Sequence, residues 1–211
     1  MRIIASDLSA PQAYKLLTGI VVPRPIAWIT SVSNVRTTNL APFSCFTFVS
    51  SNPPMVGVNI GPKESGQKDT AANIAQRGVY IVNIADDSMI GAVHSSSFEH
   101  PADVSEAELL GLATLPGEMV DCPRLRDVPV SMECRLSETA RFGRGGTAFI
   151  VGEIVCFHIR DDLHENGKIA TARLRPICRI AGPNYATLGP IVTQSALGSW
   201  GPPGTLRGPN D

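Results

Sequence analysis

The chain lacks any long apolar run. None of its hydrophobic stretches approaches the ~20 residues that a membrane-spanning helix needs. Its first residues, 1–7, also lack the apolar centre of a secretory signal peptide. We therefore expect a soluble cytoplasmic protein.

An excess of charge of either sign is also absent. Lys and Arg total 18, Asp and Glu total 19, and the formal net charge is -1. So small a net charge creates no long-range field that would attract a polyanion. We expect neither nucleic acid nor a membrane as a partner.

Metal-ligand motifs are missing as well. The five cysteines are scattered and contain no Cys-x-x-Cys pair. His94 and His100 stand at a spacing that matches neither common pattern of helical ligands. We predict no metal site, and we interpret Cys45 as a small core residue rather than a redox group.

The residues that are present favour a β-rich domain. With 211 residues and a hydrophobic content of 43%, the chain suits one domain of the larger all-β or α+β kind, with a real core. A helix at 12–17 should end at Gly19, and another at 69–76 should end at Gly78. Further short helices are expected at 87–98 and 105–110, and strands at 26–32, 40–49, 55–60, 79–84, 130–142, 148–159 and 175–180. Long strands with few, short helices indicate an antiparallel barrel or sandwich rather than a doubly wound sheet.

One apparent nucleotide motif does not fit its surroundings. Residues 143–148 match the dinucleotide pattern G-x-G-x-x-A, which requires a strand that passes into a helix. The residues that follow are rich in β-branched side chains and predict a strand instead. We interpret Gly143 to Gly146 as a hairpin turn.

The triplet Lys68-Asp69-Thr70 lies at a predicted helix start. Free backbone N–H groups and the positive end of the helix dipole favour a phosphate there, with Lys68 adding a charge and Thr70 a hydroxyl. Asp69 would repel a phosphate unless its carboxylate turned away to cap the helix. Spacing alone leaves open an ordinary capped surface helix.

Polar side chains also interrupt the predicted strands. Asn39 and Ser44 lie among apolar residues and need partners, either backbone and water or the edge of a heteroaromatic ring. Arg24 is held between Pro23 and Pro25, which suits an anion ligand or a structural ion pair equally. We place Trp28 in the core.

Taken in order, these motifs resemble the flavin reductase-like family of FMN-binding split barrels. The resemblance covers most of the chain, from about Tyr14 to Tyr185. Its most telling pieces are Pro23-Arg24-Pro25-Ile26-Ala27-Trp28, Asn39-Leu40-Ala41-Pro42-Phe43-Ser44, Pro53-Pro54, Lys68-Asp69-Thr70, Asn83-Ile84, Glu133-Cys134, Gly152-Glu153-Ile154-Val155, and Arg175-Pro176 with Arg179.

The resemblance implies a mainly β fold, a six-stranded antiparallel split barrel with short helical insertions, and a homodimer with FMN near the subunit interface. It assigns residues 1–185 to this domain and leaves a Gly/Pro-rich tail at 186–211. The glycines and prolines from Gly182 onward fit either a loose tail or an arm that lies over a partner subunit with Tyr185 and Trp200 as anchors. It places the FMN phosphate on Lys68 and Thr70, with Arg24 as a weaker candidate. The ring would lie against Asn39, Leu40, Ala41, Ser44 and Phe46, together with Thr30 and Ser31. One departure is the turn 33–38, which has no glycine where similar proteins often have one.

The implied activity is hydride transfer from NADH or NADPH to FMN. The reduced flavin or its electrons would then serve an acceptor such as a flavin-dependent monooxygenase. The cofactors carry this chemistry, so no catalytic side chain is predicted. Two alternatives stay open: an FMN-binding electron-transfer protein of the flavoredoxin type without its own NAD(P)H site, and a scaffold that has lost flavin.

Overall fold

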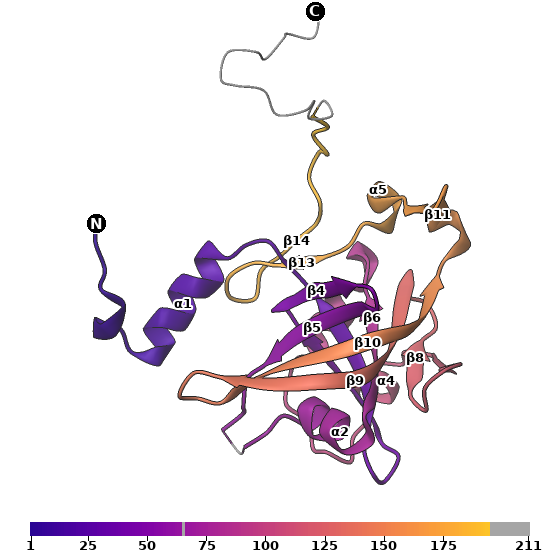
Figure 1. Cartoon of the computed structure of the whole chain (residues 1–211), viewed down its shortest axis with the longest axis horizontal. Coiled ribbons are helices and arrows are strands. Elements are labelled where there is room, and N and C mark those ends of the chain that lie inside the picture. Colours follow the sequence, from indigo (N-terminus) through magenta and orange to yellow (C-terminus); the bar gives the residue numbers. More distant parts are fainter. Residues whose placement is uncertain (65, 195–211) are drawn as a thin grey trace, which may run out of the picture.

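A computed structural model of the protein describes residues 1–64 and 66–194. Its centre is a seven-stranded antiparallel sheet with the order β3-β2-β6-β9-β10-β5-β4 (Figure 1). Among the described residues the edge strands β3 and β4 do not pair with each other, so the sheet stays open. The strands are β2 Ala27–Val32, β3 Thr38–Phe43, β4 Phe46–Ser51, β5 Pro54–Ile60, β6 Val79–Ile84, β9 Val130–Phe142 and β10 Thr147–Ile159.

The mainly β, antiparallel architecture agrees with the prediction, but the six-strand count does not. The single strand expected at 40–49 is two strands, broken at Ser44 and Cys45. The first, β3, pairs with β2, and the second, β4, pairs with β5 at the opposite edge. Cys45 lies exposed at this break, so its interpretation as a core residue was wrong.

The longest hairpin joins β9 and β10. Gly143 and Gly146 in its turn have φ angles of 65° and 66°, a conformation that glycine adopts without steric cost. The turn leads directly into β10, which confirms that this glycine-rich segment is a hairpin and not a nucleotide loop.

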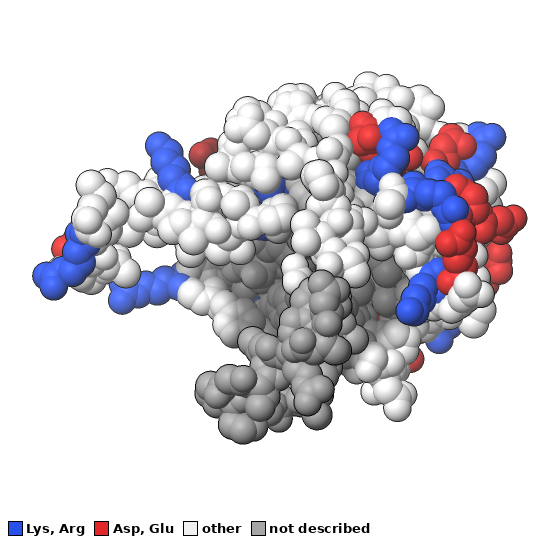
Figure 2. Space-filling view, turned by 90° about the horizontal axis from the view of Figure 1, so that it is seen from above, with Lys and Arg blue, Asp and Glu red and all other residues white. Residues whose placement is uncertain are grey.

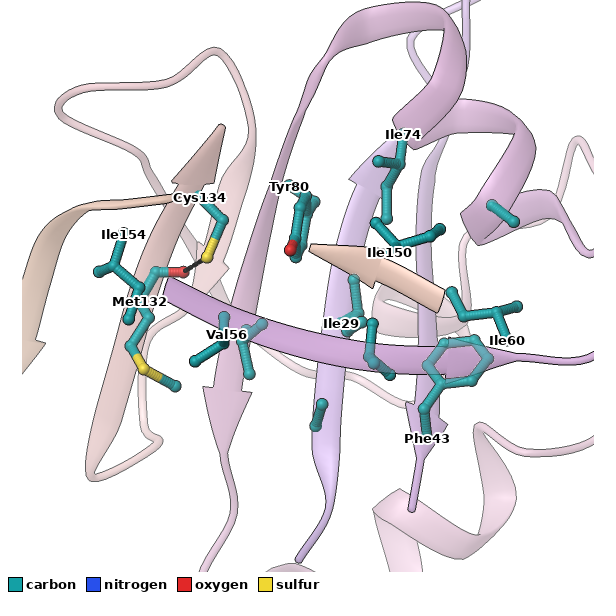
Figure 3. Packing of buried hydrophobic residues seen from close by; sticks show 14 of the residues in the cluster. Ile29, Phe43, Val56, Ile60, Ile74, Tyr80, Met132, Cys134, Ile150 and Ile154 are labelled. Atoms are coloured by element: carbon teal, nitrogen blue, oxygen red, sulfur yellow. Dashed lines mark hydrogen bonds between the residues drawn. The ribbon is translucent and has the colours of Figure 1, made fainter. Parts of the chain in front are cut away.

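The main hydrophobic core lies against this sheet (Figure 3). Tyr80, Ile29 and Ile74 are fully buried in it, and Ile150 and Ile154 from β10 pack beside them. A second cluster surrounds Trp28, which confirms that Trp28 belongs to the core.

Helix α1 (Ala10–Ile20) projects from the body of the molecule (Figures 1 and 2). Ser9 and Gln12 form a capping box at its start. Contrary to the prediction, the helix continues past Gly19, where a side chain would meet no neighbour within 4 Å. None of its residues is buried.

Helix α2 (Asp69–Arg77) ends at Gly78, whose φ of 68° confirms the predicted C-cap. The remaining elements are short. They are η1 Ala5–Asp7, η2 Asp87–Met89, α3 Ile90–Ser95, α4 Glu106–Leu109, η3 Asp161–Leu163, α5 Thr171–Leu174, β1 Arg24–Pro25, β7 Thr114–Pro116, β8 Pro123–Leu125, β11 His164–Glu165, β12 Lys168–Ile169, β13 Cys178–Arg179 and β14 Tyr185–Ala186.

Two further expectations concern the C-terminal part. The strand expected at 175–180 shrinks to β13, because Arg175 has a φ of 49°, outside the β region. Beyond β14, residues 187–194 form neither helix nor strand, and Trp200 lies outside the described residues. No helix in the described chain is long and apolar enough to cross a membrane.

Candidate functional site

Two neighbouring cavities hold most of the predicted site residues. The larger, of about 290 Å³, opens between α1 and the β13–β14 hairpin. The smaller, of about 80 Å³, lies at the start of α2. Phe43 and Ser97 line both, so the two cavities are adjacent. A ligand with a flat ring and a charged tail has room for each part.

The start of α2 faces the smaller cavity. Lys68 is the N-cap residue, and its side chain makes no capping hydrogen bond. The first intrahelical bond near this end runs from Ala72 N–H to the Lys68 carbonyl, 3.1 Å. The N–H groups of Asp69, Thr70 and Ala71 therefore lack helical acceptors. Lys68 and Thr70 line the cavity, so an ammonium group, a hydroxyl and the free N–H groups at the helix start are all available there as hydrogen-bond donors to an anion.

Asn39 fixes the hydroxyl of Thr70. Its side-chain nitrogen donates to Thr70 Oγ1 at 2.8 Å and to Ser31 Oγ at 3.4 Å. Ser31 Oγ also accepts from Asn73 at 3.2 Å. Because Thr70 Oγ1 accepts from Asn39, its own proton stays available for a ligand in the cavity.

Asp69 does not cap the helix, although capping was the expected way to turn its carboxylate away from a phosphate. Its carboxylate pairs with Lys63 instead, at 2.9 and 3.2 Å from Nζ. The consequence is similar, since the nearby lysine compensates the carboxylate. In the described part of the chain Lys68 forms no ion pair.

Arg24 lines the larger cavity, yet its donors are already in use. Nη1 donates to the carbonyls of Thr18 and Val21 at 2.8 and 2.7 Å, and Nη2 donates to that of Ile180 at 3.1 Å. Nε reaches Ser44 Oγ at 3.3 Å. The side chain therefore closes the C-terminal end of α1, a structural role, although its partners are carbonyls rather than a carboxylate.

A second arginine in the larger cavity is differently placed. The guanidinium of Arg179 lies 4.6 Å from the centre of the Tyr185 ring and donates to its hydroxyl. That hydroxyl is 3.3 Å from His94 Nδ1. Burial raises the pKa of Tyr185, and the nearby Arg179 lowers it in part. The phenol thus stays protonated at the rim of the cavity.

The other predicted residues divide into two groups. Ala41 lines the smaller cavity and Ser44 the larger one. Thr30, Ser31 and Leu40 are fully buried, and neither cavity is lined by their side chains. Phe46 packs partly buried against the main core. The second group, from Thr30 to Phe46, therefore supports the cavity walls without forming them.

Sequence reasoning missed several lining residues. Glu106 and His100 face the smaller cavity, and Tyr14 and Tyr185 the larger one. Tyr185 was considered only as an anchor on a partner subunit. Glu106 follows the N-cap Ser105, so the only signal was an ordinary acidic helix start.

The glycine-free turn 33–38 keeps a glycine-like conformation. Arg36 adopts a φ of 71° there, and its side chain forms an ion pair with Asp121, which also binds Arg77. Ser33 closes the turn by accepting from Thr37 N–H at 3.0 Å.

A third group of polar residues lies apart from both cavities. Glu133, Cys156 and His158 bring their ligand atoms within 4.8 Å of one another. Glu133 already accepts bonds from the N–H groups of residues 118–120, at 2.7 to 2.9 Å, and is 2.6 Å from His158 Nε2. These four contacts fill the acceptor positions of the carboxylate. We therefore interpret the group as structural, with Glu133 holding the loop 118–120 through its backbone N–H groups.

Comparisons with known proteins identify the family of the chain. Residues 19–176 match the model of the flavin reductase like domain. An uncharacterized protein of Halalkalibacterium halodurans is 37% identical over 194 residues, covering 90% of this chain and 93% of its own. The crystal structure of nitrilotriacetate monooxygenase component B from Bacillus cereus is 34% identical with a TM-score of 0.89, covering 92% of this chain and 98% of its own. Pseudomonas fluorescens 2-nitrobenzoate 2-nitroreductase is 29% identical with a TM-score of 0.87, covering 97% and 100%.

The matched family model spans most of the described chain and includes β1, β3 and the start of α2. Family membership supports a flavin as the cofactor and an oxidoreductase as the class of protein. The chain belongs to the flavin reductase-like family.

Proposed function

We propose that this protein binds FMN and transfers hydride from NADH or NADPH to it, as a reductase that supplies a flavin-dependent monooxygenase or a similar acceptor. The observation that carries the proposal is the uncapped start of α2, which opens into a cavity beside Lys68 and Thr70. A phosphate monoester suits those donors.

The residues present fit FMN in two parts. Lys68, Thr70 and the first N–H groups of α2 would hold the phosphate in the smaller cavity. Ser44, Phe43 and the aromatic wall of Tyr185 would hold the ring in the larger cavity. Bound flavin supplies the hydride-accepting chemistry. The chain supplies orientation, and the positive charge of Arg179 favours an electron-rich ring.

Support for a monooxygenase partner comes from one similar structure. That protein is named as component B of a nitrilotriacetate monooxygenase, and at 34% identity its likeness covers 92% of this chain. We therefore prefer a reductase to a flavoredoxin-like carrier without an NAD(P)H site. The likeness of flavoredoxin from Desulfovibrio vulgaris, at 16% identity, concerns the fold alone.

We further propose a homodimer built on α1. The helix projects from the body (Figure 1). It exposes large apolar side chains, with Leu17 60% and Ile20 74% exposed. Tyr14 and Thr18 of the same helix line the larger cavity. A second subunit that covers α1 would therefore also close the proposed ring site.

Absorbance tests the proposal directly. Purified protein, or protein loaded with FMN, should be yellow and should bleach without oxygen when NADH or NADPH is added. Colourless protein that does not bind added FMN would show that the cofactor assignment is wrong. Protein that binds FMN but is not bleached by either nicotinamide would favour the carrier instead.

Lys68→Ala tests the phosphate site. Loss of the charge should weaken FMN binding about tenfold, the size of one partly screened ion pair, while riboflavin binding stays unchanged. Lys168→Ala, an exposed lysine of β12 that lines neither cavity, is the matched control. Equal FMN affinity in both variants would remove Lys68 from the site.

A further inference from the structure

Glu106 is a buried carboxylate in the wall of the smaller cavity. It opens α4, is only 7% exposed, and accepts the N–H of Leu40 at 2.8 Å through Oε2. Because β3 is an edge strand, that N–H would otherwise lack a partner in the sheet. The bond fixes β3 between Asn39 and Ala41, which both line the cavity.

Glu106 has acidic and basic neighbours but no ion-pair partner among the described residues. The titratable groups that line the cavity with it are Lys63, Lys68, Asp69, Glu99 and His100. Lys63 is engaged by Asp69, and in the described chain no cation pairs with Glu106. An ionised Glu106 would therefore oppose the same phosphate that Lys68 attracts.

Protonation of Glu106 would replace its repulsion of a phosphate with a hydrogen bond to it. The Leu40 bond uses Oε2, so a proton on Oε1 adds an O–H donor to a side chain that lines the cavity, while Leu40 keeps its acceptor. Burial raises the pKa of Glu106 above its usual value, Asp69 adds to this effect, and the Leu40 N–H and His100 oppose it. The proton is thus within reach nearer neutral pH than for an exposed carboxylate.

We propose that Glu106 takes up one proton from solvent when the flavin phosphate enters, and so makes the cavity select phosphorylated flavin in a proton-linked way. The carboxylate becomes a carboxylic acid that donates to a phosphate oxygen, and no electron is transferred. This inference rests on the proposed function, because it requires FMN to occupy the cavity.

Calorimetry measures the proton. FMN is titrated into the protein at pH 8 in buffers of different ionisation enthalpy, where a phosphate monoester, with a second pKa of about 6, is already the dianion. The expected result is proton uptake that approaches one per FMN, with none for riboflavin, which has no phosphate.

Glu106→Gln assigns the proton. Gln keeps an oxygen for Leu40 N–H but carries no charge, so FMN should bind about tenfold more tightly at pH 8, with no proton uptake. Glu108→Gln, on the exposed face of the same helix, should behave as the unaltered protein. FMN binding without proton uptake would overturn this inference and leave the proposed function intact. Uptake that persists in Glu106→Gln would also overturn it and assign the proton to His100. Protein that binds no FMN would overturn both.

Discussion

A glycine in the middle of β10 provides a stringent test of the packing. A Cβ on Gly152 would lie 2.2 Å from the hydroxyl oxygen of Tyr80 and 2.8 and 2.9 Å from two of its ring carbons. Tyr80 is fully buried within the main core, among Ile150, Ile74 and their neighbours (Figure 3), so its ring has nowhere to move. The Gly-Glu-Ile-Val motif needs its glycine for this reason.

We expect Gly152→Ala to lower the free energy of unfolding by about 3 kcal/mol, the upper end of the range for overpacked cores. Gly145→Ala is the matched control, because a Cβ there meets nothing within 4 Å and its φ is not positive. It should change stability by less than about 0.5 kcal/mol. Urea unfolding of both flavin-free variants, followed by circular dichroism, measures the difference.

Tyr80→Phe separates the hydroxyl from the ring. The Tyr80 hydroxyl is buried without a hydrogen-bond partner in the described structure, so its removal should stabilise the fold by about 1 kcal/mol. It also removes the shortest contact of the new Cβ, so Gly152→Ala should cost about 1 kcal/mol less in the Phe background. An unchanged cost, or a Gly152→Ala protein as stable as the control, would refute this account of the motif.

Three further predictions concern the site and its supports. Asn39→Ala should weaken FMN binding about fivefold, because Thr70 loses the partner that orients its hydroxyl; unchanged fluorescence titrations would contradict this. Arg24→Lys should expose α1 to limited proteolysis and weaken FMN and riboflavin binding to the same extent, because α1 lines the ring site, whereas a loss of affinity confined to FMN would restore Arg24 as a phosphate ligand. Glu133→Gln should cost about 3 kcal/mol at pH 7, since an amide cannot accept all four donors. Burial by itself raises the pKa of Glu133, but its hydrogen bonds lower the pKa below 4.5 overall. Its stabilising contribution is therefore present above that pH and lost as the pH falls further. The difference in unfolding free energy between the Glu133→Gln variant and the unaltered protein should therefore shrink in urea titrations at acid pH. A difference that stays constant would contradict the role of Glu133 in holding the loop 118–120.

The sequence patterns predicted strands best where local signals bounded them. Strands β6 and β9 begin and end where expected, since β6 is a run rich in β-branched residues that follows Gly78 and β9 ends at the glycine turn that starts at Gly143. The break at Ser44 and Cys45 had no such signal. It arises because β3 and β4 pair with strands at opposite edges, which is a property of the sheet and not of the segment.

The same distinction applies to the site. Local spacing indicated the start of α2, whereas the family resemblance assigned Asn39 to the flavin ring and the structure bonds its side chain to Thr70 at the start of α2. Glu106 and the carbonyl partners of Arg24 were out of reach of such reasoning. The partners Leu40 and Ile180 lie 66 and 156 positions away in the chain. Contacts of this kind depend on the closed fold, and no local pattern encodes them.

The two candidate phosphate ligands, Arg24 and Lys68, therefore differ in how free their side chains are to bind an anion. Arg24 would have to release its bonds to the carbonyls of Thr18, Val21 and Ile180 before it bound an anion, and the C-terminal end of α1 would lose these partners. Lys68 has no ion pair to release in the described chain and lies beside free helical N–H groups. The smaller cavity also contains Glu106, so Lys68 would attract a phosphate there and an ionised Glu106 would repel it. Phosphate affinity in this protein should therefore depend on the protonation of one carboxylate as much as on the charge of one lysine.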